Sequence, residues 1–365
     1  MSSSENQIDT PALVIDVNIL ERNIAKMAEY LRSRKSKLRP HVKVHKSPVL
    51  AKKQIAAGAI GITVAKVSEA EVMAQSGIDD ILIANEIVGE QKLRRLARVA
   101  KRTKLQVAVD NLENVKQISH YAAQEGSNIG IIVELNLGSN LEGILDRCGV
   151  SPGEPAAALI SEVAKLKNIE FRGLMGYEGA LRKFTDAKRK CAAIESALAL
   201  LVETKEQVED AGFDVPIVSC GGTMSYDIAS GFPGVTEIQA GSYVFMDATY
   251  LRSGIDFELS LTLWSSIVSR PHANKAIMDA GYKAISADHG LPIVKNRSEM
   301  EVIALNAEHG HVSSKKQDIS CAIGEKLELI PTHVDTTVCL HDTYVLTQDG
   351  VVKGNLEIAC RGKLQ

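Results

Sequence analysis

The chain of 365 residues lacks the features that mark several specialised classes of protein. No apolar run reaches the roughly 18 residues of a membrane-spanning helix, and the polar segment from Met1 to Asp9 lacks the apolar core of a secretory signal. The six cysteines include no CxxC pair, so we expect free thiols in a reducing compartment, the cytoplasm. A net charge of -3 without any basic block predicts no nucleic-acid or membrane partner.

Short apolar runs alternate with helical patterns along the first two thirds of the chain. The eight predicted strands are 38–44, 62–66, 80–84, 105–109, 129–135, 171–177, 217–220 and 237–240. Repeated strand–helix alternation of this kind predicts an α/β fold, a (β/α)8 TIM barrel. A doubly wound open sheet is the alternative, but it often carries a glycine-rich phosphate loop after its first strand. Here that strand is followed by His45-Lys46-Ser47-Pro48, without glycine.

The pattern changes to strands alone from Ser260 onward. The predicted strands there are 261–268, 275–279, 301–306, 326–331, 336–340, 343–347 and 355–359. Gln348-Asp349-Gly350 is typical of a hairpin turn. We therefore expect a barrel over residues 1–253 and a C-terminal antiparallel β domain over 254–365, with which the first residues of the chain could also pair.

The first predicted strand carries an unusual set of side chains. Successive strand residues point to opposite faces, so Arg39, His41, Lys43 and His45 are expected to share one face. A lysine among cationic groups can have a lowered pKa and act as an amine nucleophile. The segment therefore favours Lys43 as a Schiff-base lysine, and a basic, solvated edge strand is the alternative.

Polar residues follow most of the predicted barrel strands, at the carboxyl ends where barrel enzymes build their sites. They are Lys43, His45, Asn85, Glu86, Asp110, Asn136, Gly138, Tyr177, Ser219 and Gln239. The loops after the seventh and eighth strands often hold a phosphate. Gly221-Gly222-Thr223 and Gly241-Ser242 offer backbone N–H groups and hydroxyls for one. A nucleophilic lysine together with a phosphate site predicts pyridoxal 5′-phosphate (PLP) as the cofactor.

The β domain contains His333-Val334-Asp335. On a strand, residues i and i+2 face the same side, so the imidazole and the carboxylate could chelate one divalent metal ion, Mn2+, Mg2+ or Zn2+. A surface His-x-Asp without a metal is the alternative. His309 and His311 flank Gly310, and we expect that pair to lie solvated in a turn.

Seven segments spread over the chain carry a specific resemblance to known enzymes. They are Thr10-Pro11-Ala12-Leu13-Val14, Arg39-Pro40-His41-Val42-Lys43-Val44-His45-Lys46, Ser68-Glu69-Ala70-Glu71, Asp146-Arg147-Cys148-Gly149-Val150, Ser219-Cys220-Gly221-Gly222-Thr223, Glu237-Ile238-Gln239-Ala240-Gly241-Ser242-Tyr243 and Pro331-Thr332-His333-Val334-Asp335. In these segments the chain resembles the D-threonine aldolase and D-serine dehydratase family of PLP enzymes. That family has the alanine racemase-like fold, PLP fold type III.

The resemblance implies a homodimer and a set of site residues. It makes Lys43 the Schiff-base lysine, puts Arg147 near the pyridine nitrogen of PLP, and makes His333 and Asp335 the metal ligands. The other residues that match cofactor contacts are Tyr177, Thr223, Gly241, Ser242 and Tyr250.

The residue two places after His333 bears on the reaction. Dehydratases of this family tend to carry cysteine there and aldolases aspartate. A thiolate selects Zn2+, whereas a carboxylate accepts harder ions such as Mn2+. Asp335 therefore favours an aldolase that cleaves a D-β-hydroxy-amino acid to glycine and an aldehyde. The base for the β-hydroxyl is then a metal-bound water or a histidine, with His45 as the local candidate. A dehydratase acting on D-serine or 3-hydroxyaspartate is the alternative; an amino-acid racemase or a non-catalytic PLP carrier would leave the metal pair unexplained.

Overall fold

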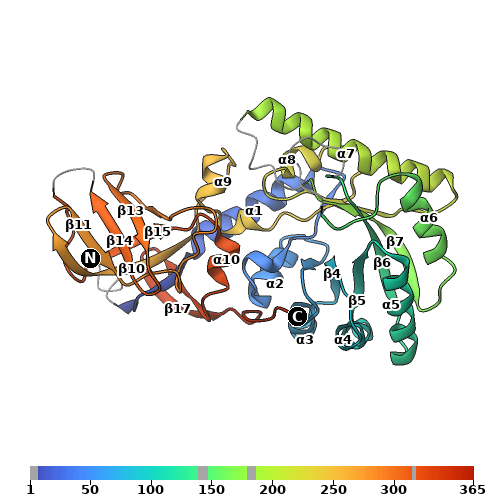
Figure 1. The fold of residues 1–365 in the computed structure, drawn as a ribbon, viewed down its shortest axis with the longest axis horizontal. Coiled ribbons are helices and arrows are strands. Elements are labelled where there is room, and N and C mark those ends of the chain that lie inside the picture. The colour runs from blue at the N-terminus through green and yellow to red at the C-terminus, as the bar shows by residue number, and fades with distance from the viewer. Residues whose placement is uncertain (1–6, 139–146, 179–185, 315–317) are drawn as a thin grey trace. The chain divides into compact units, whose positions relative to one another are not determined.

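The computed structural model describes residues 7–138, 147–178, 186–314 and 318–365 (Figure 1). The chain divides into two compact units. The β unit comprises Met1–Lys26, Val44–Ser47 and Ser242–Gly362, and the barrel unit comprises Met27–Lys43, Pro48–Gly241 and Lys363–Gln365. Among the described residues, no helix is both long enough and apolar enough to cross a membrane.

The barrel unit is built on eight parallel strands in the order β2-β9-β8-β7-β6-β5-β4-β3. Their bounds are β2 Lys37–Leu38, β3 Ile62–Val64, β4 Asp80–Glu86, β5 Lys104–Val109, β6 Ile129–Leu135, β7 Ile169–Gly176, β8 Ile217–Cys220 and β9 Glu237–Ile238. A parallel bridge joins His41, beyond β2, to Thr63 of β3 at the other edge of the sheet. The sheet therefore closes on itself, and the predicted (β/α)8 barrel is confirmed.

Helices follow the barrel strands and cover the outside of the sheet (Figure 1). Their bounds are α2 Pro48–Ala56, α3 Val67–Gln75, α4 Glu90–Ala100, α5 Leu112–Glu125, α6 Glu154–Val163, α7 Ala187–Asp210 and α8 Tyr226–Ala229. In α4, Leu93, Leu96 and Ala97 are buried at helical spacing, so one apolar stripe fixes the helix to the sheet. Asn111 caps the N-terminus of α5, where its side chain accepts the backbone N–H of Glu113 at 2.8 Å.

Four neighbouring barrel strands each contribute one side chain to a shared core cluster. Leu82, Ala108, Ile132 and Met175 come from β4, β5, β6 and β7, and all four are buried. Because each strand places a buried side chain at the same level, the carboxyl ends of these strands are held in a fixed arrangement.

The predicted strand over 38–44 is wrong beyond its first residue. β2 ends at Leu38, and Val42–Val44 form a 3-10 helix, η2. The N–H groups of Arg39 and His41 still donate to the carbonyls of Ile238 and Gln239, but Pro40 has no N–H to donate, and the chain turns into η2 directly after His41. The four polar residues consequently share no face: Lys43 is exposed, and His45 is fully buried. Arg39 is buried and pairs with Glu237 and Asp80.

The β unit is built on a nine-stranded sheet with the path β13-β14-β11-β10-β1-β16-β17, while β15 pairs with both β10 and β12. The bounds are β1 Ala12–Asp16, β10 Leu261–His272, β11 Lys275–Met278, β12 Ile293–Val294, β13 Met300–Leu305, β14 Gly310–Ser314, β15 Lys326–Ile330, β16 Thr343–Gln348 and β17 Val351–Glu357. β1 pairs antiparallel with β10 and parallel with β16. The helix α1, Val17–Arg32, follows β1 directly. The predicted hairpin turn is confirmed, since Asp349 and Gly350 have φ of 52° and 72° between β16 and β17.

Two local predictions in the β unit are wrong. Residues 336–340 are not a strand, because α10 spans Val334–Val338. There the hydroxyl of Thr337 donates to the carbonyl of His333 at 2.9 Å, and this local contact outweighs the preference of β-branched residues for strands. His311 does not lie in a turn either; it lies on β14, and its Nε2 is 2.5 Å from the side-chain oxygen of Asn306.

Candidate active site

Lys43 lies where the first barrel strand has just ended, in the 3-10 helix η2. Its neighbours Val42 and Val44 are completely buried, whereas Lys43 itself is exposed. Buried neighbours on both sides fix the backbone here and leave the amine accessible. The accessibility that an amine nucleophile needs is therefore present, although the strand face that suggested this role is not.

Three of the predicted cofactor residues meet at the carboxyl ends of neighbouring strands. The Arg147 guanidinium lies 5.1 Å from the centre of the Tyr177 ring, a cation–π contact. A Cβ atom on Gly222 would lie 3.4 Å from the same ring. The loops after β6, β7 and β8 thus converge on Tyr177, which remains 42% exposed.

The loop after β8 differs from the expectation of bare backbone amides. The N–H of Gly221 donates to the Glu178 carboxylate at 3.2 Å, and the N–H of Gly222 donates to the Ser225 hydroxyl at 3.0 Å. Glu178 also accepts the Ser225 hydroxyl and is completely buried. Burial raises the pKa of Glu178, and the hydrogen bonds from Ser225 and Gly221 oppose that rise. Both amides are thus already engaged within the loop, which leaves Thr223 as its predicted phosphate contact.

Two further residues that were predicted at the carboxyl ends of the barrel strands have structural partners in the barrel unit. The buried hydroxyl of Ser219 accepts a hydrogen bond from the Gln239 amide at 2.9 Å. Gly241 lies so close to the backbone of His41 that a Cβ atom would come within 2.3 Å of the His41 carbonyl oxygen. Glycine is therefore required at 241 by packing, whatever else binds there.

An acidic cluster lies beside Arg147 and was not foreseen as a unit. Glu134 of β6 is buried, and its carboxyl group is hydrogen-bonded to Glu86 at the end of β4. Burial and then the charge of Glu86 raise the pKa of Glu134 to about 9, although Arg147 partly opposes this. Asp110, at the end of β5, accepts the backbone N–H of Gly149 at 3.1 Å. Glu134 reads in the sequence as one polar residue within an apolar strand, so nothing there indicated a protonated acid.

In the β unit, the predicted residues Ser242 and Tyr250 are hydrogen-bonded through their hydroxyls at 3.1 Å. Tyr250 lies on α9, Ala248–Arg252, which begins at the buried Asp247. One carboxylate oxygen of Asp247 accepts the N–H groups of Thr249 and Tyr250, and the other accepts the N–H of Val334 at 3.1 Å. Burial raises the pKa of Asp247 to about 6, against these hydrogen bonds. Asp247 therefore ties the Tyr250 helix to the segment that carries the predicted metal ligands.

His45 also belongs to the β unit and is completely buried. Its Nδ1 accepts the backbone N–H of Ser47 at 3.1 Å, so the neutral ring carries its proton on Nε2. Its carbonyl accepts the Tyr344 hydroxyl at 2.8 Å, and its ring packs edge-on against Phe245. The role of His45 as a base stays a prediction.

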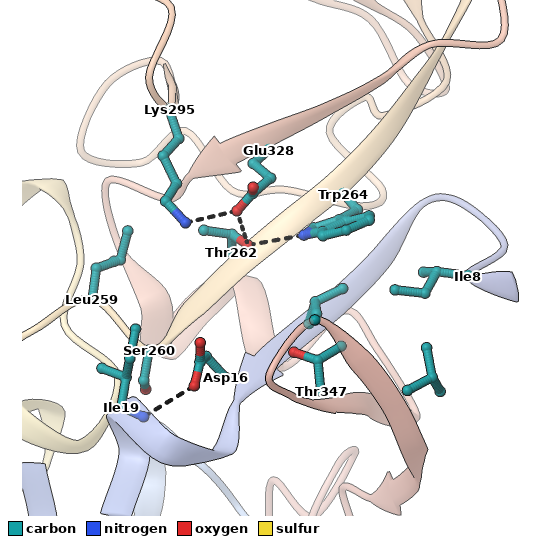
Figure 2. Close-up of a pocket in the computed structure, with 13 residues that line it drawn as sticks. Ile8, Asp16, Ile19, Leu259, Ser260, Thr262, Trp264, Lys295, Glu328 and Thr347 are labelled. Atoms are coloured by element: carbon teal, nitrogen blue, oxygen red, sulfur yellow. Dashed lines mark hydrogen bonds and ion pairs between the residues drawn. The ribbon is translucent and has the colours of Figure 1, made fainter. Parts of the chain in front are cut away.

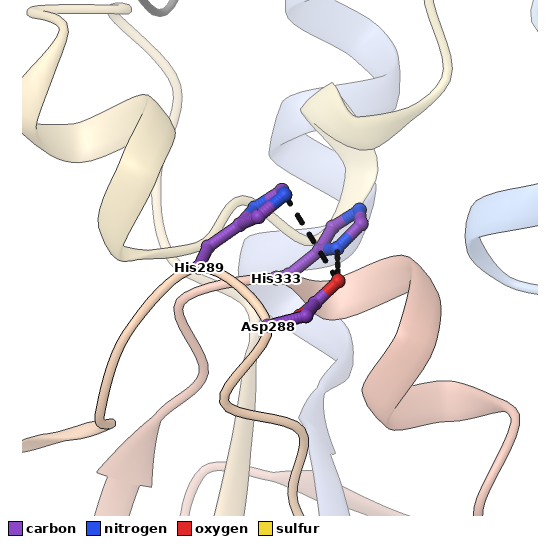
Figure 3. Close-up of side chains that lie close together, drawn as sticks. All are labelled: Asp288, His289 and His333. Atoms are coloured by element: carbon purple, nitrogen blue, oxygen red, sulfur yellow. Dashed lines mark hydrogen bonds and ion pairs between the residues drawn. The ribbon is translucent and has the colours of Figure 1, made fainter.

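His333 lies at the N-terminus of α10 and Asp335 in the first turn of that helix, so the strand geometry that suggested their chelation is wrong. His333 instead forms a cluster with Asp288 and His289, in which three ligand atoms lie within 4.8 Å of one another (Figure 3). His333 Nδ1 is 2.6 Å from the Asp288 carboxylate. Burial alone would raise the pKa of Asp288, but hydrogen bonds from His333 and Ser286 and the two imidazoles lower it to about 2. Asp288 and His289 were missed because they lie far from His333 in the sequence.

A cavity of about 210 Å³ in the β unit is separate from these residues (Figure 2). It is lined by Asp16, Lys295 and Glu328 among others, and none of the predicted site residues lines it. Lys295 and Glu328 are paired at 2.8 Å, and Glu328 also accepts the Thr262 hydroxyl at 3.3 Å. Lys295 and Glu328 thus satisfy one another, and Asp16 accepts the backbone N–H of Ile19 at 3.0 Å.

Comparison with known proteins agrees with this architecture. Residues 15–249 match the alanine racemase N-terminal domain, and residues 260–347 match a putative serine dehydratase domain. The chain is 36% identical to a D-threonine aldolase of Arthrobacter sp over 98% of this chain and 93% of that protein. It is also 36% identical to a 3-hydroxy-D-aspartate aldolase of Paracoccus denitrificans, over 98% and 94%.

A solved structure and a more distant relative are also similar to this chain. The structure of a D-threonine aldolase from Filomicrobium marinum has a TM-score of 0.94 and 35% identity, covering 98% of this chain and 97% of that one. The chain belongs to the D-threonine aldolase and D-serine dehydratase family. Within this family a D-threo-3-hydroxyaspartate dehydratase of Delftia sp. is 28% identical, over 95% of this chain and 96% of that protein.

The residues present suit both groups that membership of this family implies. For PLP, the barrel unit offers an exposed lysine side chain at Lys43 and a guanidinium at Arg147. For a divalent metal, His333 and Asp335 are an imidazole and a carboxylate, a donor set that suits Mn2+, Mg2+ or Zn2+.

Proposed function

We propose that this protein is a PLP- and metal-dependent lyase that cleaves D-β-hydroxy-amino acids to glycine and an aldehyde, as a D-threonine aldolase does. The observation that carries this proposal is the imidazole of His333 and the carboxylate of Asp335 at the start of α10, in a chain that also offers the lysine of a PLP enzyme. A racemase or a carrier of PLP has no use for such a pair of metal ligands. Similarity over nearly the whole length to two aldolases supports the same choice.

The proposal assigns the cofactor contacts mainly to the barrel unit. Lys43 would hold PLP covalently through its amine, and Arg147, which lies against the Tyr177 ring, would lie near the pyridine nitrogen. The other proposed contacts are Ser219, Thr223, Gly241, Ser242 and Tyr250, whereas the N–H groups of Gly221 and Gly222 are engaged within their own loop. When bound, PLP stabilises negative charge at the α-carbon of an amino acid, which is what bond cleavage at that carbon requires.

The proposal assigns the metal to His333 and Asp335, with Mn2+ as the first choice because a carboxylate accepts hard ions. A metal at this position acts as a Lewis acid toward a hydroxyl group. His45 is the proposed acceptor of the hydroxyl proton. It can take up that proton only after its Nδ1 releases the Ser47 N–H, and His45→Asn is the variant that tests this role. We also propose a cytoplasmic homodimer, for which sedimentation would give twice the chain mass of 39.4 kDa. The six free cysteines suit the reducing compartment.

The test of function is an incubation of the purified protein with PLP and Mn2+, offering D-threonine, D-3-hydroxyaspartate and D-serine separately. We expect glycine and acetaldehyde from D-threonine, glycine and glyoxylate from D-3-hydroxyaspartate, and no pyruvate from D-serine. L-Threonine serves as the matched control and should give no aldehyde. Pyruvate and ammonia from D-serine, without glycine from either β-hydroxy substrate, would show a dehydratase instead.

A further inference from the structure

We propose that Asp288 and His289 are positioning residues that hold His333 for metal binding, and that neither of them binds the metal. The inference rests on the proposed metal site. The inference adds two neighbouring residues to that site. Asp288, the first of them, precedes His333 by 45 positions in the sequence. Figure 3 shows the three side chains gathered at the start of α10.

The contact with Asp288 determines which nitrogen of His333 is available. Asp288 Oδ2 lies 2.6 Å from His333 Nδ1, so Nδ1 carries the ring proton and donates a hydrogen bond to the carboxylate. The ring is thereby left with Nε2 as its metal-binding atom. A carboxylate behind a ligating imidazole is a recurrent arrangement that fixes the tautomer and the ring orientation and makes the ligand more basic.

Asp288 is itself held in place through its second oxygen. Asp288 Oδ1 accepts the hydroxyl of Ser286 at 2.7 Å and the hydroxyl of Thr336 at 3.2 Å. Thr336 lies on α10, the helix that starts at His333. Both carboxylate oxygens of Asp288 therefore already accept hydrogen bonds from the protein, which suits a supporting group better than a metal ligand.

His289 supports His333 from a different direction. The two rings are stacked, with centres 3.9 Å apart and planes within 12° of each other. The lone pair of an imidazole nitrogen lies in the plane of its ring, so lone pairs on these two stacked rings lie in nearly parallel, separate planes and cannot both be directed at one ion. Stacking of this kind limits rotation of the His333 ring from one of its faces. The hydrogen bond to Asp288 limits the same rotation from the edge of the ring.

Titration of the PLP-loaded protein with MnCl2 alone, followed by calorimetry or by the free Mn2+ EPR signal, tests the Asp288 contact. We expect Asp288→Ala to weaken Mn2+ binding by about 10- to 100-fold, and Asp288→Asn, which keeps an acceptor for Nδ1, to lose clearly less. The matched control is Asp342→Ala, which removes an exposed carboxylate that pairs with Arg361 and should bind as the wild type does. Equal losses in Asp288→Asn and Asp288→Ala would make Asp288 a ligand and overturn the inference, as would wild-type affinity in both.

The same titration separates stacking from ligation at His289. We expect His289→Phe, which keeps a flat ring, to bind Mn2+ within about 3-fold of wild type, and His289→Ala to bind more weakly. Equal, large losses in both would make His289 a ligand and overturn the inference. His333→Ala should lose Mn2+ binding altogether; if it binds like wild type, the proposed metal site itself fails. Loss in His333→Ala together with wild-type binding in the Asp288 and His289 variants would overturn only the inference and leave the proposed function standing.

Discussion

Replacing Lys43 by alanine is expected to lower the rate of D-threonine cleavage by about 10³-fold or more. This is the scale of loss seen when a covalent catalytic group is removed. Lys43 offers an accessible amine between two buried valines, so the change removes the amine and leaves the apolar contacts of η2 in place. The measurement is the turnover of PLP-loaded variant and wild type at saturating D-threonine and Mn2+.

Borohydride reduction followed by peptide mapping identifies the attached lysine independently of turnover. We expect the label on Lys43 in the wild type and no label in the variant. Lys52→Ala is the control, since it removes another exposed lysine amine from the neighbouring helix α2. A label on Lys46 or Lys66 would refute the assignment of Lys43, while the lyase reaction could still be observed.

The barrel could be predicted from the sequence because its evidence is local. Each of β3 to β7 is a short apolar run followed by a helical pattern, and the structure has a strand and then a helix at these positions. The prediction failed where a single residue overrides the pattern around it. Pro40 cannot donate a backbone N–H, and the hydroxyl of Thr337 bonds to the carbonyl of His333, which favours a helix over a strand.

The residues of the candidate site divide in the same way. Lys43 and His333 carry chemistry that is visible in their own segments. The groups that hold the site in place, Glu178, Asp247 and Asp288, read as ordinary acidic residues in loops and helix starts. Their roles depend on burial and on partners such as Gly221, which only the folded chain brings together.

The substitution Glu134→Gln is expected to stabilise the protein relative to the wild type, and increasingly so as the pH rises from 5 to 9. Burial and the neighbouring Glu86 raise the pKa of Glu134 to about 9 from an ordinary value of 4.5. Between these values the folded protein holds a proton that the unfolded chain has lost, so the free energy of unfolding falls as the pH rises. The slope is at most about 1.4 kcal/mol per pH unit. One oxygen of Glu86 is buried without a hydrogen-bond partner among the described residues, so a second negative charge beside it is unfavourable.

Glu134→Gln removes this dependence because an amide cannot ionise and its N–H can still donate to Glu86. We expect the variant to match the wild type near pH 5 and to exceed it by about 2 kcal/mol or more at pH 8. Urea unfolding followed by circular dichroism at unit steps from pH 5 to pH 9 measures the difference. Glu170→Gln is the control, because its carboxylate is 56% exposed beside Arg172 and should shift no part of the profile. Parallel profiles for Glu134→Gln and wild type would mean that Glu134 is already ionised in the folded protein at neutral pH, paired with Arg147 rather than protonated against Glu86.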